Sequence, residues 1–148
     1  MSLENKIMEQ MKEAMKSKNT IALEALRAIK SEILLAKTSG ADASISDDQE
    51  IAMLQKLIKQ RKEAAEQFGA NGRNELAEKE LAQAEVIQGF LPKQLSQEEL
   101  ESELREIISQ VGATSGKDMG KVMGAASAKL AGKAEGKTIA ETVKKLLN

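Results

Sequence analysis

Apolar residues recur at helical spacing along most of the chain, and no stretch alternates apolar and polar residues as a half-buried strand would. This pattern predicts a first helix from about residue 3 and a second from about residue 20, separated by a break at 17–19. Residues 37–45 are predicted to be a loop, because Gly, Ser, Thr and Asp cluster there without a period. The first stripe consists of Leu3, Ile7, Met8, Met11 and Met15.

A third and a fourth helix are predicted to form an antiparallel hairpin. Ser46 with Gln49 has the pattern of a capping box at the start of the third helix. Residues 69–72 end that helix, and the fourth stops before Pro92, the only proline in the chain.

Arg61 and Glu80 are charged residues at apolar-stripe positions of these two helices. They face each other if the hairpin turns between residues 70 and 71. We interpret them as a semi-buried ion pair that sets the helix register, in preference to a functional arginine site.

Three shorter helices are predicted after the proline. Ser96 with Glu99 forms a second capping-box pattern, and Gly112 stands where a helix C-terminus favours glycine. Ser115 with Asp118 is expected to cap a sixth helix, and a seventh starts near residue 137. The prediction is an all-α protein with a four-helix N-terminal domain over 1–91, a linker over 92–95 and a three-helix C-terminal domain over 96–148.

The composition excludes several functions. Among 148 residues there is no His, Cys, Tyr or Trp, and Phe68 and Phe90 are the only aromatic residues. The commonest general base, the thiolate nucleophile and the usual metal ligands are therefore missing. We expect no catalytic residue, no metal and no cofactor. The charged N-terminus and the short apolar runs predict a cytoplasmic protein with no membrane partner.

Charge is unevenly distributed along the C-terminal part of the chain. Residues 112–148 hold seven lysines against three acids, a net charge of +4, whereas 96–111 carries −4 and 1–95 carries −1. A local basic patch on a nearly neutral protein indicates an anionic partner. The candidate binding residues are Lys117, Lys121, Lys129, Lys133, Lys137, Gly120, Gly124, Gly132 and Gly136.

The glycines of this segment have two interpretations. Glycine inside a helix is less favourable than alanine by up to about 1 kcal/mol, so some other interaction should offset it. Close packing against a neighbouring helix is the explanation we favour from the sequence alone. The alternative is that bare backbone lets a phosphate backbone approach. A nucleotide-binding P-loop is excluded at 132–138, because only three residues separate its glycines.

Several motifs of this chain resemble those of a known family. KDMGKVMG (117–124), Lys129 and GKAEGK (132–137) resemble the C-terminal tail domain of the GatB component of the tRNA-dependent Asp/Glu amidotransferase. RKEAAEQF (61–68), GRNELAEKE (72–80) and FLPKQLS (90–96) are similar to the short stand-alone proteins that share that tail, known as the GatB/YqeY family.

The resemblance implies a helical N-terminal domain followed by a small tail associated with tRNA engagement. The catalytic parts of the amidotransferase lie outside that tail. The chain departs from the family pattern at Ala128, where proline is usual, at Ala131, where a basic residue is common, and at Glu135, where aspartate is usual.

Three functions remain open at the level of the sequence. The first is a non-catalytic module that binds tRNA or another structured RNA through phosphate contacts, or that associates with an amidotransferase, as the resemblance implies. The second is a protein-interaction module without an RNA role, whose Met-rich N-terminal surface (Met8, Met11 and Met15) packs against another protein or against a second copy of the chain. The third is a carbon–nitrogen ligase with glutamine as amido-nitrogen donor, for which only Ser–Lys chemistry would be at hand.

Overall fold

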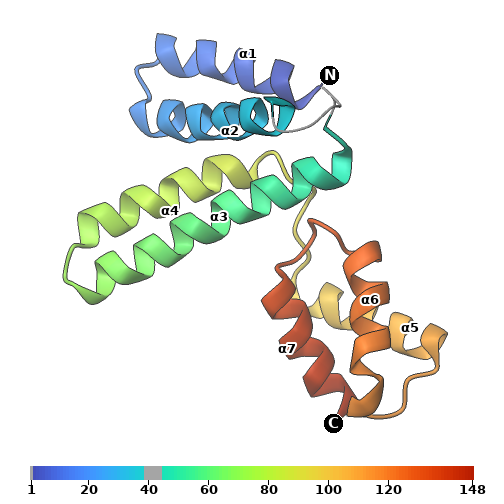
Figure 1. Cartoon of the computed structure of the whole chain (residues 1–148). Helices are drawn as coiled ribbons and strands as arrows, with labels where there is room; N and C mark the ends of the chain where they lie inside the picture. Colours follow the sequence, from blue (N-terminus) through green and yellow to red (C-terminus); the bar gives the residue numbers. More distant parts are fainter. Residues whose placement is uncertain (1, 39–44) are drawn as a thin grey trace. The chain divides into compact units, whose positions relative to one another are not determined.

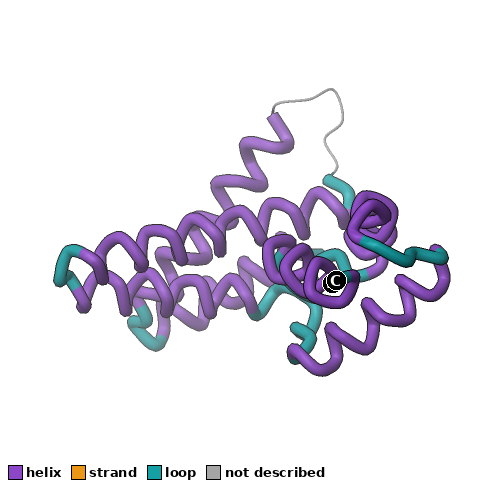
Figure 2. Tube along the Cα trace, turned by 90° about the horizontal axis from the view of Figure 1, so that it is seen from below, coloured by secondary structure: helices purple, strands orange, loops and turns teal. Residues whose placement is uncertain are grey.

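The computed structural model describes residues 2–38 and 45–148, and these residues form seven α-helices, one short 3-10 helix and no strand (Figures 1 and 2). This confirms the all-α prediction. The chain divides into two compact units, Met1–Leu91 and Pro92–Asn148. Each unit has its own apolar core.

The first unit consists of two helical hairpins. Helices α1 (Leu3–Lys16) and α2 (Thr20–Thr38) form one, and α3 (Asp47–Ala70) and α4 (Asn74–Gln88) form the other. Helix α2 packs on α1 and on α4, so it joins the hairpins (Figure 1). Its most deeply buried side chains are aliphatic and belong to Ala25, Leu26, Ile29 and Ile33.

The capping box of α3 is confirmed. The backbone N–H of Gln49 donates to Oγ of Ser46 at 3.2 Å, and the N–H of Ser46 donates to Oε1 of Gln49 at 2.9 Å. The loop predicted over 37–45 starts too early, because α2 continues to Thr38, whose hydroxyl donates to the carbonyl of Leu34 at 3.0 Å. Residues 39–44 of that predicted loop lie outside the described residues.

The register of the α3–α4 hairpin differs from the prediction. Arg61 and Glu80 form no ion pair; Nε of Arg61 donates instead to Oε1 of Gln83 at 3.1 Å. The turn between the helices spans 71–73, with Gly72 at a φ of 75°. The turn is therefore centred further along the chain than expected, and Arg61 meets a residue three positions beyond Glu80.

Gln83 connects three helices of this unit. Its side chain is buried, and its Nε2 donates to a carboxylate oxygen of Glu24 on α2 at 2.7 Å. Glu24 also pairs with Lys79 at 3.3 Å, and Arg61 makes a second hydrogen bond to the carbonyl of Leu57. Both ends of the buried amide are thus satisfied, which offsets the free energy of burying it.

The second unit contains three α-helices. They are α5 (Gln97–Val111), α6 (Met119–Lys129) and α7 (Gly136–Leu147), with a 3-10 helix, η1 (Gly116–Asp118), before α6. The capping box of Ser96 and Glu99 is confirmed, and Gly112 ends α5 at a φ of 70°. The core of this unit includes Leu100, Leu104, Ile107, Val122, Leu130, Ile139 and Val143.

The predicted linker at 92–95 belongs to the second unit. The backbone N–H of Leu95 donates to the carbonyl of Lys133 at 2.9 Å, and Nε2 of Gln94 donates to the carbonyl of Gly132. The side chain of Leu95 also packs on the core of this unit. These contacts hold the entry to α5 against the turn between α6 and α7.

Replacement of Gln83 by alanine should destabilise the first unit. The change removes two hydrogen bonds and leaves charged partners in a part-buried site, so we expect the free energy of unfolding to fall by about 2 kcal/mol. Hydrogen exchange of α3 and α4 peptides in urea measures this unit separately from the other. The control Glu85→Ala, an exposed site on the same helix, should stay within about 0.5 kcal/mol. An equal effect of both variants would show that the buried amide has no special role.

Candidate nucleic-acid interface

The segment that leads into α6 is organised by Asp118. Its Oδ2 accepts the backbone N–H of Thr114 at 3.0 Å, and Oγ of Ser115 accepts the N–H of Lys117 at 3.4 Å. Ser115 therefore caps this helical segment, as the sequence predicts, but the segment begins with the 3-10 turn of η1, and α6 itself starts only at Met119. Lys117 lies within this turn, and Lys121 follows it in the first turn of α6.

The carboxylate of Asp118 is stabilised in its charged form. The N–H of Thr114 lowers its pKa below the ordinary value of 3.8, and the N–H of Ser115 and the charge of Lys121 act in the same direction. The charged carboxylate thus supports the turn at neutral pH.

Four of the five candidate lysines are exposed and make no ion pair with a carboxylate in the described part of the chain. Lys117 lies on η1, Lys121 on α6, Lys133 on the turn after α6, and Lys137 in the first turn of α7. Helices α6 and α7 pack side by side and run in opposite directions (Figure 1). These four ammonium groups are therefore available to an anion.

Two of the candidate residues have structural partners. Nζ of Lys129 lies 3.6 Å from a carboxylate oxygen of Glu103 on α5, so a phosphate would have to replace that acid. An exposed ion pair of this kind contributes only about 0–1 kcal/mol. Gly132 is buried, has a φ of 76°, and accepts the side chain of Gln94 at its carbonyl. Its role is to make the turn.

Within the part of the chain that the structure describes, the helical glycines of this unit have open space beside them. A Cβ atom added at Gly116, Gly120, Gly124 or Gly136 would have no neighbouring atom within 4 Å. The helix-packing explanation that we favoured from the sequence is therefore wrong for these positions. Gly120 and Gly124, four residues apart on the outer side of α6, leave a strip of helix backbone exposed.

Lys144 is a further exposed lysine of α7 that the sequence-based prediction of binding residues missed. It follows Lys137 by seven residues, two helical turns, so both side chains lie on the same exposed side of α7. Lys144 also lies in the last turn of α7, where a base is favoured by the negative end of the helix dipole. The helical period of the lysines was the signal that could have identified it. We call Lys117, Lys121, Lys137, Lys144, Gly120 and Gly124 the α6–α7 face.

Helix α5 is acidic, in contrast to the basic α6–α7 face. It carries five glutamates, and Glu101 binds Lys145 of α7 at 3.4 Å and lies 3.8 Å from Arg105. A hydrogen bond from Gln97, followed by one from Lys145, lowers the pKa of Glu101. The acids of the second unit are therefore concentrated on α5, whereas the lysines are in excess over residues 112–148, and this uneven charge favours approach of an anion to the α6–α7 part.

Neither a metal-binding cluster nor a membrane-spanning helix is found in the described residues. They contain no group of three or more acidic side chains placed to hold a metal ion. Within the same residues, no helix has the length and apolar character needed to cross a bilayer.

Comparison with known proteins identifies the family. The family model described as "Yqey-like protein" matches residues 4–147, nearly the whole chain. The chain belongs to this family. The match includes both units and the α6–α7 face, and it agrees with the resemblance seen in the sequence motifs.

Three curated relatives come from fungi. "Altered inheritance of mitochondria protein 41, mitochondrial" of Pyrenophora tritici-repentis is 40% identical over 54% of this chain and 44% of its own length. The protein of the same name from Candida glabrata is 32% identical over 68% of this chain and 57% of its own length. A Schizosaccharomyces pombe protein is 35% identical over 64% of this chain and 76% of its own length. The chain spans about half the length of the first two.

Replacement of Gly124 by alanine should stabilise the second unit. Its position lies inside α6, and the added Cβ meets open space, so the better helix propensity of alanine raises the free energy of unfolding by about 1 kcal/mol. Hydrogen exchange of α6 amides measures the change. The reciprocal variant Ala128→Gly, one turn further on the same side, should lose stability. A destabilised Gly124→Ala protein would mean that the site is covered after all.

Acidification should weaken the turn before α6. Because the folded-state pKa of Asp118 lies below its unfolded value, this group stabilises the fold at pH values above the ordinary pKa of 3.8, and its contribution is lost as the pH falls from there through the folded pKa. A carboxyl-carbon NMR titration should give a pKa below 3.8. Asp118→Asn keeps the acceptor oxygen but not the charge, so it should unfold at a lower temperature at pH 7 and depend less on pH. A titration midpoint at or above 3.8 would contradict this.

Proposed function

We propose that the second unit is a non-catalytic docking module for a base-paired RNA, with tRNA as the candidate ligand. The α6–α7 face would contact phosphates through its lysines and through the exposed backbone of α6. Such contacts position an RNA without reading its bases. Because the module would carry no reaction of its own, any chemistry on the RNA would belong to a partner.

The observation that carries this proposal is the uncovered glycine strip. Gly120 and Gly124 lower helix stability and are not compensated by packing within the described chain. A bulky anionic ligand that approaches the helix backbone would supply the missing compensation. Lys117 and Lys121 lie beside that strip, where they would pair with the phosphates of such a ligand.

The charge and the residue types favour a folded RNA over an open strand. Single-stranded RNA is bound chiefly by stacking its bases on aromatic side chains, and this chain has two phenylalanines, both in the first unit. A base-paired RNA presents a regular phosphate backbone, which lysines can contact without stacking. The resemblance of 117–137 to the amidotransferase tail makes tRNA the first ligand to test.

The names of the fungal relatives concern the cellular location of those proteins and not a ligand. Two of them are named for altered inheritance of mitochondria and are called mitochondrial. The cytoplasmic location expected from the sequence therefore stays a prediction. The RNA ligand rests on the chemistry of the α6–α7 face and not on these names.

Binding of unfractionated tRNA by fluorescence anisotropy, at a series of KCl concentrations, tests the proposal. We expect the affinity to fall steeply with salt because phosphate contacts release counterions. Lys117→Ala with Lys121→Ala should weaken binding to all tRNAs alike and reduce the salt slope by about 2. The matched control Lys56→Ala with Lys59→Ala removes two exposed charges from α3 and should change little.

Two further measurements separate backbone approach from charge alone. Gly124→Leu adds no charge but fills the glycine strip, so it should weaken tRNA binding several-fold while α6 stays folded. A homopolymeric single strand of similar length should bind less tightly than tRNA. No binding at low salt, or binding that does not depend on salt, would overturn the proposed function.

A further inference from the structure

One side of the α1–α2 hairpin is apolar, basic and exposed. On α1, Met8 and Met15 are 52% and 54% exposed, and on α2 Leu34 is 54% exposed. Such side chains are normally covered when they gather in one place. We define the α1–α2 seam by six residues, Met8, Met11 and Met15 of α1 and Arg27, Lys30 and Leu34 of α2.

The ion pair between Glu4 and Lys37 shows which sides of the two helices meet. The methionines follow Glu4 along α1 at steps of four, three and four residues. On α2, the chain goes from Arg27 to Lys30, then to Leu34 and then to Lys37, in steps of three, four and three residues. Each set therefore runs along its helix from the ion pair, and the two sets line opposite walls of the same seam.

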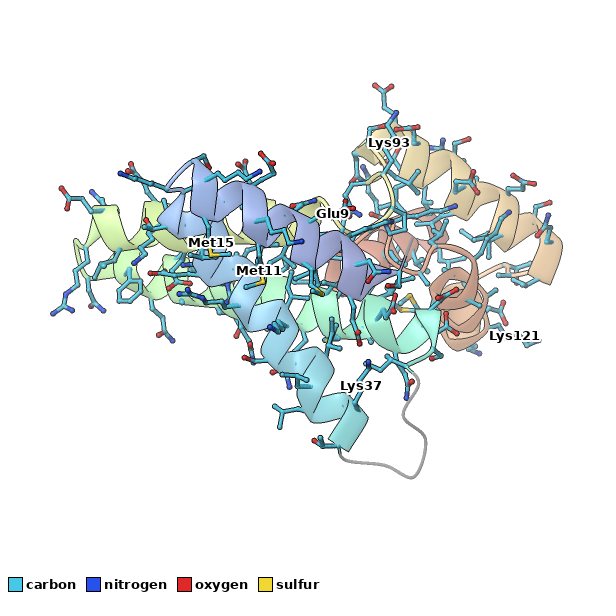
Figure 3. All side chains as sticks on the ribbon, turned by 90° about the horizontal axis from the view of Figure 1, so that it is seen from above. Glu9, Met11, Met15, Lys37, Lys93 and Lys121 are labelled. Atoms are coloured by element: carbon cyan, nitrogen blue, oxygen red, sulfur yellow. The ribbon has the colours of Figure 1, made fainter. Side chains whose placement is uncertain are left out.

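The side-chain view agrees with this placement. Figure 3 shows Met11 and Met15 on the side of α1 that lies next to α2, with Lys37 near the far end of α2. Met11 is half-buried and packs on the core below, as does Leu23 of α2. The seam is thus continuous with the apolar core at its base and open to solvent at its rim.

The spacing of the seam fits a helix as occupant. Alternating steps of three and four are those of coiled-coil stripes, in which side chains of one helix insert between those of its neighbours. Two antiparallel helices with such stripes on the same side leave a groove of the right shape for a third helix. Methionine side chains are flexible and polarisable, and they adapt well to the apolar side chains of a partner.

The charges of the seam specify the partner further. Arg27 and Lys30 are exposed and form no ion pair in the described residues, and Lys12 is exposed next to Met8 and Met15 on α1. The one acid of these stripes, Glu4, is already paired with Lys37. A second copy of the same seam would place bases against bases, which opposes self-association through this surface.

We propose that the α1–α2 seam binds an amphipathic helix of another protein, whose apolar stripe is flanked by Asp and Glu. The acidic helix of this chain is not that partner, because the apolar side of α5 is buried through Leu100, Leu104 and Ile107. The inference is independent of the RNA-docking proposal, since it uses only the first unit.

A pair of synthetic peptides tests this inference with the full chain. Both span three heptads with Leu at the a and d positions; one has Glu and the other Lys at e and g, which also opposes self-pairing of each peptide. In fluorescence anisotropy we expect the Glu peptide to bind at least tenfold more tightly than the Lys peptide. Arg27→Glu with Lys30→Glu should reverse that preference.

Matched variants separate the seam from general apolar exposure. Met8→Asp with Met15→Asp should reduce binding of the Glu peptide at least tenfold, while circular dichroism shows that the helices remain. Leu35→Asp with Leu81→Asp makes the same charge change at exposed apolar sites outside the seam, and should leave peptide binding unchanged.

Four outcomes would overturn the proposal. The first is equal binding of both peptides, and the second is an equal effect of the seam variants and the control variants. The third is loss of tRNA binding by the seam variants, which would assign the seam to RNA. The fourth is that the protein binds phosphatidylglycerol vesicles but not the Glu peptide, and that the seam variants abolish this vesicle binding; the occupant would then be an anionic membrane surface. Failure of tRNA binding with intact Glu-peptide binding would affect only the RNA proposal.

Discussion

Because the chain has only two aromatic residues, both cores are built from short aliphatic side chains. A core of Leu, Ile, Val and Ala fills only a narrow space between helices, so each helix buries a narrow stripe and leaves the rest of its surface outside. The stability of the fold then depends on accurate helix ends and on a few polar contacts. The buried amide of Gln83 in the first unit, and the contact of Leu95 with Lys133 in the second, are contacts of this kind.

The narrow cores also leave surfaces free for binding. In the second unit, Gly120 and Gly124 on the outer side of α6 have open space beside them in the described part of the chain, and small and basic residues surround them. In the first unit, one side of the α1–α2 hairpin keeps methionines exposed. The two surfaces differ in chemistry, since one presents backbone and lysines and the other presents apolar side chains with bases. This difference is why we propose different kinds of partner for them, an RNA for one and an acidic helix for the other.

Local sequence signals predicted most helix ends. The capping boxes at Ser46 and Ser96 and the left-handed Gly112 depend on residues at most four positions apart, so the sequence contains all the atoms involved. The periodic stripes predicted the all-α class for the same reason. The start of the sixth helix was predicted less accurately. Asp118 accepts the N–H of Thr114, and the helical segment begins with a 3-10 turn and not directly with an α-helix.

The sequence by itself determined the helices, their caps, the uneven charge and the identity of the candidate lysines, because these follow from neighbours along the chain. Only the tertiary structure decided which residues meet across helices. Because the α3–α4 turn is centred on Gly72, Arg61 hydrogen-bonds to Gln83 and does not pair with Glu80. Residues 92–95 belong to the second unit because they hydrogen-bond to the turn between α6 and α7. The tertiary structure also decided that the glycines of α6 are uncovered and that Lys129 is paired with Glu103. Exposure and pairing are properties of neighbours in space, and no local pattern contains them.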